Sequence, residues 1–178
     1  MKKQGFTLIE LMVVIVIMGI LAAVAVPKLF GMIAKSKASE VGPAAGTYVK
    51  LQDAYISEVG YAMGNWAKIG YQAPGNAGST TNFNYKEATA AAAWTGGTVT
   101  LPASSGTAQL GWAGLNKANL NDCTGDGATV NWAVAVKAGT NGGTAQYATF
   151  VNTANKCDAL TANFDALGTS KLTSAPTL

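Results

Sequence analysis

The feature that most constrains this chain is an apolar segment near its N-terminus. Between Phe6 and Val26 the only charged residue is Glu10, and Lys2 and Lys3 form a short basic head before it. These 21 residues span about 31 Å as a helix, which matches the hydrocarbon core of a bilayer. The alternative is a secretory signal peptide, which has a shorter apolar core and an Ala-x-Ala-like end such as residues 23–25. Such a core has no reason to carry Glu10, so a membrane-spanning helix is the preferred interpretation.

The residues from Gly5 to Glu10, GFTLIE, link the basic head to the apolar segment. A basic leader ending in Gly, an aromatic residue, an acid four residues later and an uninterrupted apolar helix resemble the N-terminal signature of type IV pilins and type II secretion pseudopilins. The resemblance covers residues 1 to about 60. It implies that a prepilin peptidase cleaves between Gly5 and Phe6 and methylates the new amine of Phe6. Gly5 suits a protease that needs an unhindered backbone.

Glu10 needs a partner, because an ionisable residue at membrane depth costs about 2.5 to 3.5 kcal/mol. Cleavage after Gly5 creates a positive amine at Phe6, four residues away on the same helical face. Glu10 can pair with that amine in its own chain or with the amine of a neighbouring subunit, and the resemblance favours the neighbour. We therefore expect Glu10 to set the register of filament assembly. The alternative is a protonated Glu10 that snorkels to the interface.

Composition limits the remaining functions. The chain has 178 residues, enough for one helix and one modest domain, and its formal charge of +3 falls to +1 without Lys2 and Lys3. It contains no Arg and no His, which removes the usual phosphate clamps and the commonest general base and metal ligand. We predict no enzymatic activity, no cofactor, no metal and no nucleic-acid partner.

The apolar helix is predicted to continue as an amphipathic half over residues 28–60. Gly19 and Pro27 weaken its hydrogen bonding and mark positions of flexibility, although a simple bend explains them nearly as well. A kink is expected at Gly42-Pro43. Lys2 and Lys3 place the head in the cytoplasm. Lys28, Lys35 and Lys37 follow the span on its other side, but they do not reverse this orientation, because long domains translocate largely regardless of charge.

Residues 61–97 are predicted to form a long αβ-loop, rich in Gly, Asn, Ser and Ala, with an alanine patch at 90–93. Its aromatic residues either anchor the loop to the sheet, the simpler interpretation, or form a surface that binds sugars or partners. They are Trp66, Tyr71, Phe83, Tyr85 and Trp94.

Strands are predicted at 98–101, 108–112, 130–137 and 145–151. Residues 130–137 alternate, with Val130, Trp132, Val134 and Val136 on one face, as a half-buried antiparallel strand requires. The glycine-rich stretch 138–143 then forms a hairpin connection. The predicted fold is α+β: a long N-terminal helix packed on a C-terminal antiparallel sheet over residues 98–178.

The two cysteines are Cys123 and Cys157, whose midpoint is residue 140, inside the predicted hairpin. In a symmetric hairpin they face each other at its open end, so we predict a disulfide there, which persists in an exported domain. The disulfide-bounded C-terminal region of type IV pilins is similar. Two free buried thiols are the alternative.

The stretch Asn121–Gly127 contains Asp122 and Asp126 near a tight turn, as calcium loops do. It lacks the spacing and terminal Glu of an EF-hand. A capped Asp-Gly turn is therefore the simpler interpretation, and calcium binding there is the competing hypothesis.

These features divide the chain into a leader (1–5), a transmembrane and filament-core helix (6–27), its amphipathic half (28–60), the αβ-loop (61–97) and the sheet (98–178).

The resemblance implies a structural subunit that waits in the inner membrane and then forms a homopolymeric extracellular pilus. Its partners would be the peptidase, an assembly ATPase and a platform protein. The alternatives are a type II secretion pseudopilin and a minor pilin or adhesin. The signature does not choose among adhesion, twitching motility, DNA uptake and secretion.

Overall fold

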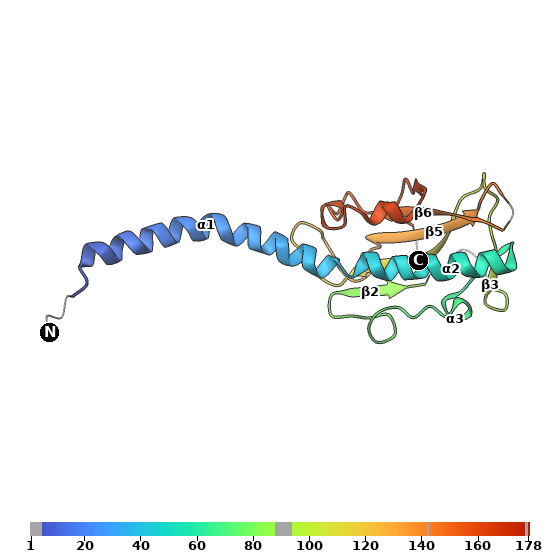
Figure 1. The fold of residues 1–178 in the computed structure, drawn as a ribbon, viewed down its shortest axis with the longest axis horizontal. Helices are drawn as coiled ribbons and strands as arrows, with labels where there is room; N and C mark the ends of the chain where they lie inside the picture. Colours follow the sequence, from blue (N-terminus) through green and yellow to red (C-terminus); the bar gives the residue numbers. More distant parts are fainter. Residues whose placement is uncertain (1–4, 88–93, 142, 177) are drawn as a thin grey trace.

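A computed structural model of the chain describes residues 5–87, 94–141, 143–176 and 178. A long helix projects from a domain built of a second helix and a five-stranded sheet (Figure 1). This is the α+β arrangement that the sequence predicts, with a long N-terminal helix followed by a mostly antiparallel sheet. The basic head and the alanine patch at 90–93 lie outside the described residues.

The single helix expected over residues 6–60 is divided in two. Helix α1 spans Leu8–Ala38 and helix α2 spans Val41–Val59, with the break at Ser39 and Glu40. Pro43 is the third residue of α2, and a proline ring clashes with the carbonyl four residues earlier, which here belongs to Ser39. The break therefore falls just before the Gly42-Pro43 pair at which a kink is expected.

Other features of the two helices also bear on the expected boundaries. Helix α1 begins at Leu8 rather than at Phe6, and it continues through Gly19 and Pro27 without interruption. Helix α2 ends at Val59, where Gly60 adopts a left-handed conformation with φ of +87°. Glycine adopts this conformation without steric cost, which makes it the common residue just after a helix.

The main sheet has the strand order β2-β4-β5-β6-β7. Neighbouring strands are antiparallel except β6 and β7, which are parallel. The strands are β2 (Phe83–Lys86), β4 (Gln109–Asn116), β5 (Trp132–Ala138), β6 (Ala145–Val151) and β7 (Ser170–Lys171). A second sheet pairs β1 (Ala62–Gly64) with β3 (Thr98–Thr100). The remaining elements are the helix α3 (Trp66–Ile69) and the 3₁₀ turns η1 (Asp158–Leu160) and η2 (Phe164–Leu167).

Two details of the sheet differ from the expected division of the chain. The region 61–97 is not only a loop, because it contains β1, α3 and β2, and β2 forms an edge of the main sheet. The strand expected at 98–101 pairs with β1 instead of joining the main sheet. Both differences concern strands of three or four residues, whose pairing depends on partners distant in sequence.

The core has one cluster on each face of the sheet. Helix α2 covers the first face, where Tyr48 and Ile56 pack with Trp112 and Trp132. On the second face, buried residues including Ala133 and Phe150 pack beneath the C-terminal residues Leu172 and Leu178. Strand β5 is therefore buried on both faces, not half-buried as predicted. Val130 was expected to lie on the same face as Trp132, but it belongs to the second cluster.

A bulge in β4 accommodates the buried Tyr48 side chain of α2 in this core. The pairing of β4 with β5 shifts register between Leu110 and Trp112, at Gly111. A Cβ atom at Gly111 would lie 1.9 Å from the hydroxyl oxygen of Tyr48. Tyr48 is fully buried, and its hydroxyl has no hydrogen-bond partner among the described residues. Gly111 therefore leaves the space that the Tyr48 ring fills.

Candidate processing and assembly site

The predicted cleavage bond lies in an open segment before the first helix. Gly5, Phe6 and Thr7 are exposed and belong to neither helix nor strand. A side chain at Gly5 would meet no atom within 4 Å, and the Phe6 side chain is 82% exposed. The Gly5–Phe6 bond is therefore accessible on all sides.

Thr7 and Glu10 form a reciprocal capping box at the start of α1. The Thr7 backbone N–H and hydroxyl donate to Glu10 Oε2 at 2.9 and 2.6 Å, and the Glu10 N–H donates to Thr7 Oγ1 at 3.3 Å. Together these bonds satisfy two donors that a helix N-terminus leaves unpaired. Sequence reasoning missed the role of Thr7, although the spacing Thr-x-x-Glu is the signature of this motif.

The capping box explains why α1 starts at Leu8 and keeps Glu10 in its first turn. Phe6, where the predicted amine would appear after cleavage, lies outside α1, two residues before its first residue, so the helical face that Phe6 and Glu10 were expected to share is not formed in the uncleaved chain. In the uncleaved chain the carboxylate is occupied by Thr7. Glu10 therefore already has hydrogen-bond partners in its own chain before any subunit contact forms.

The surface of α1 is apolar and uncovered over most of its length. Its most apolar 18-residue stretch has a mean hydropathy of 2.9, and none of that stretch is buried. By length and composition the helix can cross a membrane. The only buried residues of α1 are Ala34 and Ala38, at its C-terminal end.

The cysteine pair predicted from the sequence is confirmed. Cys123 and Cys157 form a disulfide with a Cα–Cα distance of 4.6 Å, and both residues are fully buried. The bond joins the segment after β4 to the segment after β6. It lies near the open end of the β5–β6 hairpin, where Trp132 pairs with Val151.

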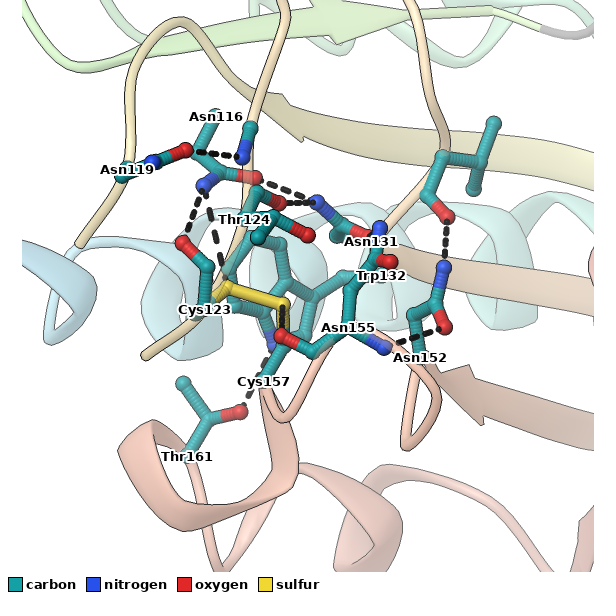
Figure 2. The surroundings of a disulfide bond; sticks show 12 residues. Asn116, Asn119, Cys123, Thr124, Asn131, Trp132, Asn152, Asn155, Cys157 and Thr161 are labelled. Carbon is teal, nitrogen blue, oxygen red and sulfur yellow. Dashed lines mark hydrogen bonds between the residues drawn. A yellow bond between two sulfur atoms is a disulfide. The ribbon is translucent and has the colours of Figure 1, made fainter. Parts of the chain in front are cut away.

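Asparagine side chains connect the chain segments around this disulfide (Figure 2). The Asn131 side chain donates to the Asn116 side-chain oxygen at 2.5 Å, and its own oxygen accepts from the Asn155 side chain at 2.9 Å. The Asn152 side-chain oxygen accepts from the Asn155 backbone N–H at 3.1 Å. A satisfied buried polar network fixes the relative position of its segments. Nothing in the spacing of these residues predicted it.

Asp126 caps its own turn. Its Oδ1 accepts from the backbone N–H groups of Thr129 and Ala128 at 2.7 and 2.9 Å, and its Oδ2 accepts from the Thr129 hydroxyl at 2.9 Å. These hydrogen bonds, that from the Thr129 backbone first, lower the pKa of Asp126 to about 2. Both Asp126 oxygens are thus engaged by the loop, as the capped-turn interpretation expects. Among the described residues, no group of three or more acidic or cysteine side chains could hold a metal.

The aromatic residues of the 61–97 region anchor it to the core. Tyr71, Phe83 and Tyr85 are at most 4% exposed. The Trp66 Nε1–H donates to the Gly111 carbonyl oxygen at 3.0 Å. Trp94 packs against the core cluster on the face that α2 covers, which is called the main cluster below. The predicted alternative of a sugar-binding aromatic surface is wrong for the three buried rings.

Comparison with known proteins adds to this geometry. The family described as "Prokaryotic N-terminal methylation motif" matches residues 1–26. The Type IV major fimbrial protein FimA of Dichelobacter nodosus is 34% identical over 122 residues, which are 68% of this chain and 63% of that protein. The chain belongs to the type IV pilin family.

Two other relatives match a shorter part of this pilin. The Type IV major pilin protein PilA of Myxococcus xanthus is 36% identical over 87 residues, which are 43% of this chain and 40% of PilA. The Fimbrial protein EcpC of Eikenella corrodens is 42% identical over 74 residues, 42% of this chain and 48% of EcpC. The matches thus span less than half the length of both relatives. No solved structure matches the chain significantly.

The predicted processing, assembly and disulfide residues of this pilin fall in two separate places. Gly5, Phe6 and Glu10 lie together at the start of α1, whereas Cys123 and Cys157 lie in the domain at the other end of the molecule (Figure 1). The pilin family is one of structural subunits and not of enzymes, as the sequence predicts. The N-terminal group is therefore the candidate site for processing and assembly.

Proposed function

We propose that this chain is the structural subunit of a type IV pilus. The observation that carries the proposal is the apolar surface of α1, which no other described part of the chain covers. An apolar surface of this size is stable only in a membrane or against other apolar surfaces. The bilayer supplies the first environment and the helices of other subunits supply the second.

Processing by a prepilin peptidase is the first step of this proposal. The peptidase cuts between Gly5 and Phe6 and methylates the new amine of Phe6. The exposed segment before α1 supports this step, because a protease binds its substrate in an extended form that Gly5 does not hinder. The remaining chain then begins one residue before Thr7, the N-cap of α1.

Assembly joins the α1 helices of successive subunits in a homopolymer. Glu10 pairs with the Phe6 amine of a neighbouring subunit, and Gly19, Pro27 and Pro43 allow the helix to adjust. The capping box supports this role for Glu10, because it holds the carboxylate in the first turn, near the end of the helix where the amine forms.

The cellular route follows from the same proposal. The subunit spans the inner membrane through residues 6–27 before assembly, and the domain lies on the exported side. An assembly ATPase and a platform protein then move it into a pilus at the cell surface. The disulfide supports export of the domain, because such bonds persist in oxidising compartments.

The experiment is to shear cells that produce the chain, image the released fraction and measure the intact mass of its main protein. We expect long filaments built of a chain that begins at methylated Phe6 and carries the disulfide. Processed protein that stays in the membrane fraction without surface fibres would contradict a pilus subunit and favour the pseudopilin or a minor subunit.

Two substitutions at Glu10 separate its charge from its capping role. Gln keeps the capping box, since Gln serves as well as Glu at this position, but it carries no charge. If the charge sets the register, Glu10→Gln and Glu10→Ala are both cleaved normally and both fail to form filaments. Normal filaments from Glu10→Gln would show that the capping box, and not pairing with the amine, is what assembly requires.

A further inference from the structure

We propose that Lys28, Lys35 and Lys37 form a binding site for the headgroups of anionic phospholipids. The site rests on the proposed membrane stage, in which α1 spans the bilayer and the domain lies on the exported side. The proposed ligand is a phosphate-bearing lipid of the outer leaflet of the inner membrane. It binds a part of α1 that buries only Ala34 and Ala38 against the domain.

The position of the lysines follows from the length of the helix. From Leu8 to Pro27, α1 covers about 30 Å, so Lys28 lies where the hydrocarbon core ends. Lys35 follows about two turns later on the same side of the helix as Lys28, and Lys37 lies just over half a turn further on, on the opposite side, so the three lysines bind headgroups around the helix. Helical side chains lean toward the N-terminus of their helix, so Lys35 and Lys37 both reach back toward the membrane surface.

The residues between the lysines also suit the membrane interface. Leu29, Phe30, Met32 and Ile33 are 43 to 62% exposed in the described chain. The apolar surface of α1 therefore continues past the hydrocarbon core into the headgroup region. Lysines placed just outside a membrane-spanning stretch are attracted to anionic lipid headgroups at the membrane surface.

The positive charge of this segment is not neutralised within the described residues. The sequence contains no acidic residue between Glu10 and Glu40. The Glu40 carboxylate faces the domain, where it accepts hydrogen bonds from the Thr80 and Tyr85 hydroxyls at 2.7 and 2.9 Å. The ion pair found in the described part of the chain joins Lys171 and Asp165, so the three lysines remain available to an anion.

One lysine also borders a groove. A hollow of about 530 Å³ lies between the α1–α2 junction and the η1–η2 segment, and Lys35, Ala38, Leu160 and Phe164 are among its lining residues. A headgroup held by Lys35 has a concave surface beside it, whereas Lys37 does not line this groove. Lys35 is therefore expected to contribute more than Lys37.

The test uses the full chain in nanodiscs of phosphatidylcholine with a minor fraction of phosphatidylglycerol. Native mass spectrometry counts the phosphatidylglycerol molecules that remain bound after release. The variant replaces Lys28, Lys35 and Lys37 by Gln. The matched control replaces Lys50, Lys68 and Lys86 by Gln, three exposed lysines of the domain, and so removes the same charge elsewhere.

We expect the wild type and the control to retain phosphatidylglycerol and the Lys28/Lys35/Lys37 variant to lose it. Each lysine near an anionic surface changes binding about fivefold, and Lys35→Gln alone should lower retention more than Lys37→Gln. Retention should also fall with added salt. Equal retention by the variant and the wild type, or equal loss by the control, would overturn the site.

Resistance to alkaline extraction is measured first on the same samples. If the wild-type chain is extracted, the membrane stage itself is wrong and the lipid site falls with it. If the chain stays in the bilayer but shows no preference for phosphatidylglycerol, the proposed function stands and only the lipid site is wrong.

Discussion

Removing the Cys123–Cys157 disulfide should destabilise the domain by about 4 kcal/mol without changing its native structure. The two cysteines are 34 residues apart, and the chain-entropy treatment gives about 4 kcal/mol for a closed loop of this length. For a chain of 178 residues this corresponds to a decrease in Tm of about 10 °C.

The native contacts around the bond explain why the fold should survive. The Cys157 backbone N–H donates to the Asn152 carbonyl oxygen at 3.1 Å, and Asn116 donates to the Cys123 carbonyl oxygen at 3.4 Å. Neither hydrogen bond needs the sulfur atoms. A double Cys→Ala variant therefore keeps the backbone part of the asparagine network.

The assay compares the oxidised chain, the reduced chain and the double Cys→Ala variant in a detergent that covers α1. Urea unfolding followed by tryptophan fluorescence gives the free energy and the m value of each. Because the bond acts on the unfolded chain, the m value should rise when the bond is absent and more surface becomes exposed on unfolding. Near-ultraviolet circular dichroism should remain native in all three.

The result that would refute this reasoning is a loss of less than about 1 kcal/mol, well below the loop-closure value. A second contrary result is an unchanged m value together with a lost near-ultraviolet signal. The bond would then hold the native packing together directly, and the loop length would not set its contribution.

Three further predictions follow from the core and the loops. Tyr48→Phe should raise the free energy of unfolding by about 1 kcal/mol, because it removes an unpaired buried hydroxyl. Gly111→Ala should lower the free energy of unfolding by about 1 to 3 kcal/mol, and by less when it is combined with Tyr48→Phe. Urea unfolding of the two single variants and the double variant tests both expectations. The folded pKa of Asp126, about 2, lies below its usual 3.8, so its hydrogen bonds stabilise the fold above about pH 4 and this contribution is lost as the pH falls through 2; Asp126→Ala should lower Tm at pH 7 but not near pH 2. Millimolar calcium should leave the Tm of the wild type unchanged, since the loop already engages both oxygens of Asp126, and a calcium-dependent rise would revive the metal hypothesis.

Features encoded by neighbouring residues were predictable from the sequence. The length and polarity of residues 6–26 indicate the projecting helix, and Gly60 ends α2 because its left-handed conformation suits glycine. The β5–β6 hairpin follows from alternation and a glycine-rich turn. The position of residue 140 within that turn then indicated the cysteine pairing.

The rest of the fold depends on contacts between distant segments. Strand β2 has four residues, and it becomes part of the sheet only by pairing with β4. The second core cluster forms because Leu172 and Leu178 pack over the sheet, so alternation in β5 could not reveal that both its faces are buried. The asparagine network likewise exists only after β4, β5 and the segment after β6 have come together.

The capping box of Thr7 and Glu10 is a different case, because its signal was present in the sequence. A Thr followed three residues later by Glu before an apolar run predicts a helix start at the residue after Thr. The membrane cost of Glu10 drew attention to its charge alone. The structure adds that the same carboxylate also fixes where α1 begins.

The break between α1 and α2 separates the part of the chain that changes environment from the part that must stay folded. Only Ala34 and Ala38 of α1 are buried, whereas α2 contributes Tyr48 and Ile56 to the main cluster. Movement of α1 from a bilayer into a filament therefore removes few contacts from the domain. Glu40 lies at the break, and its hydrogen bonds to Thr80 and Tyr85 fix the junction to the domain. The domain can thus keep one structure in both surroundings of the proposed cycle.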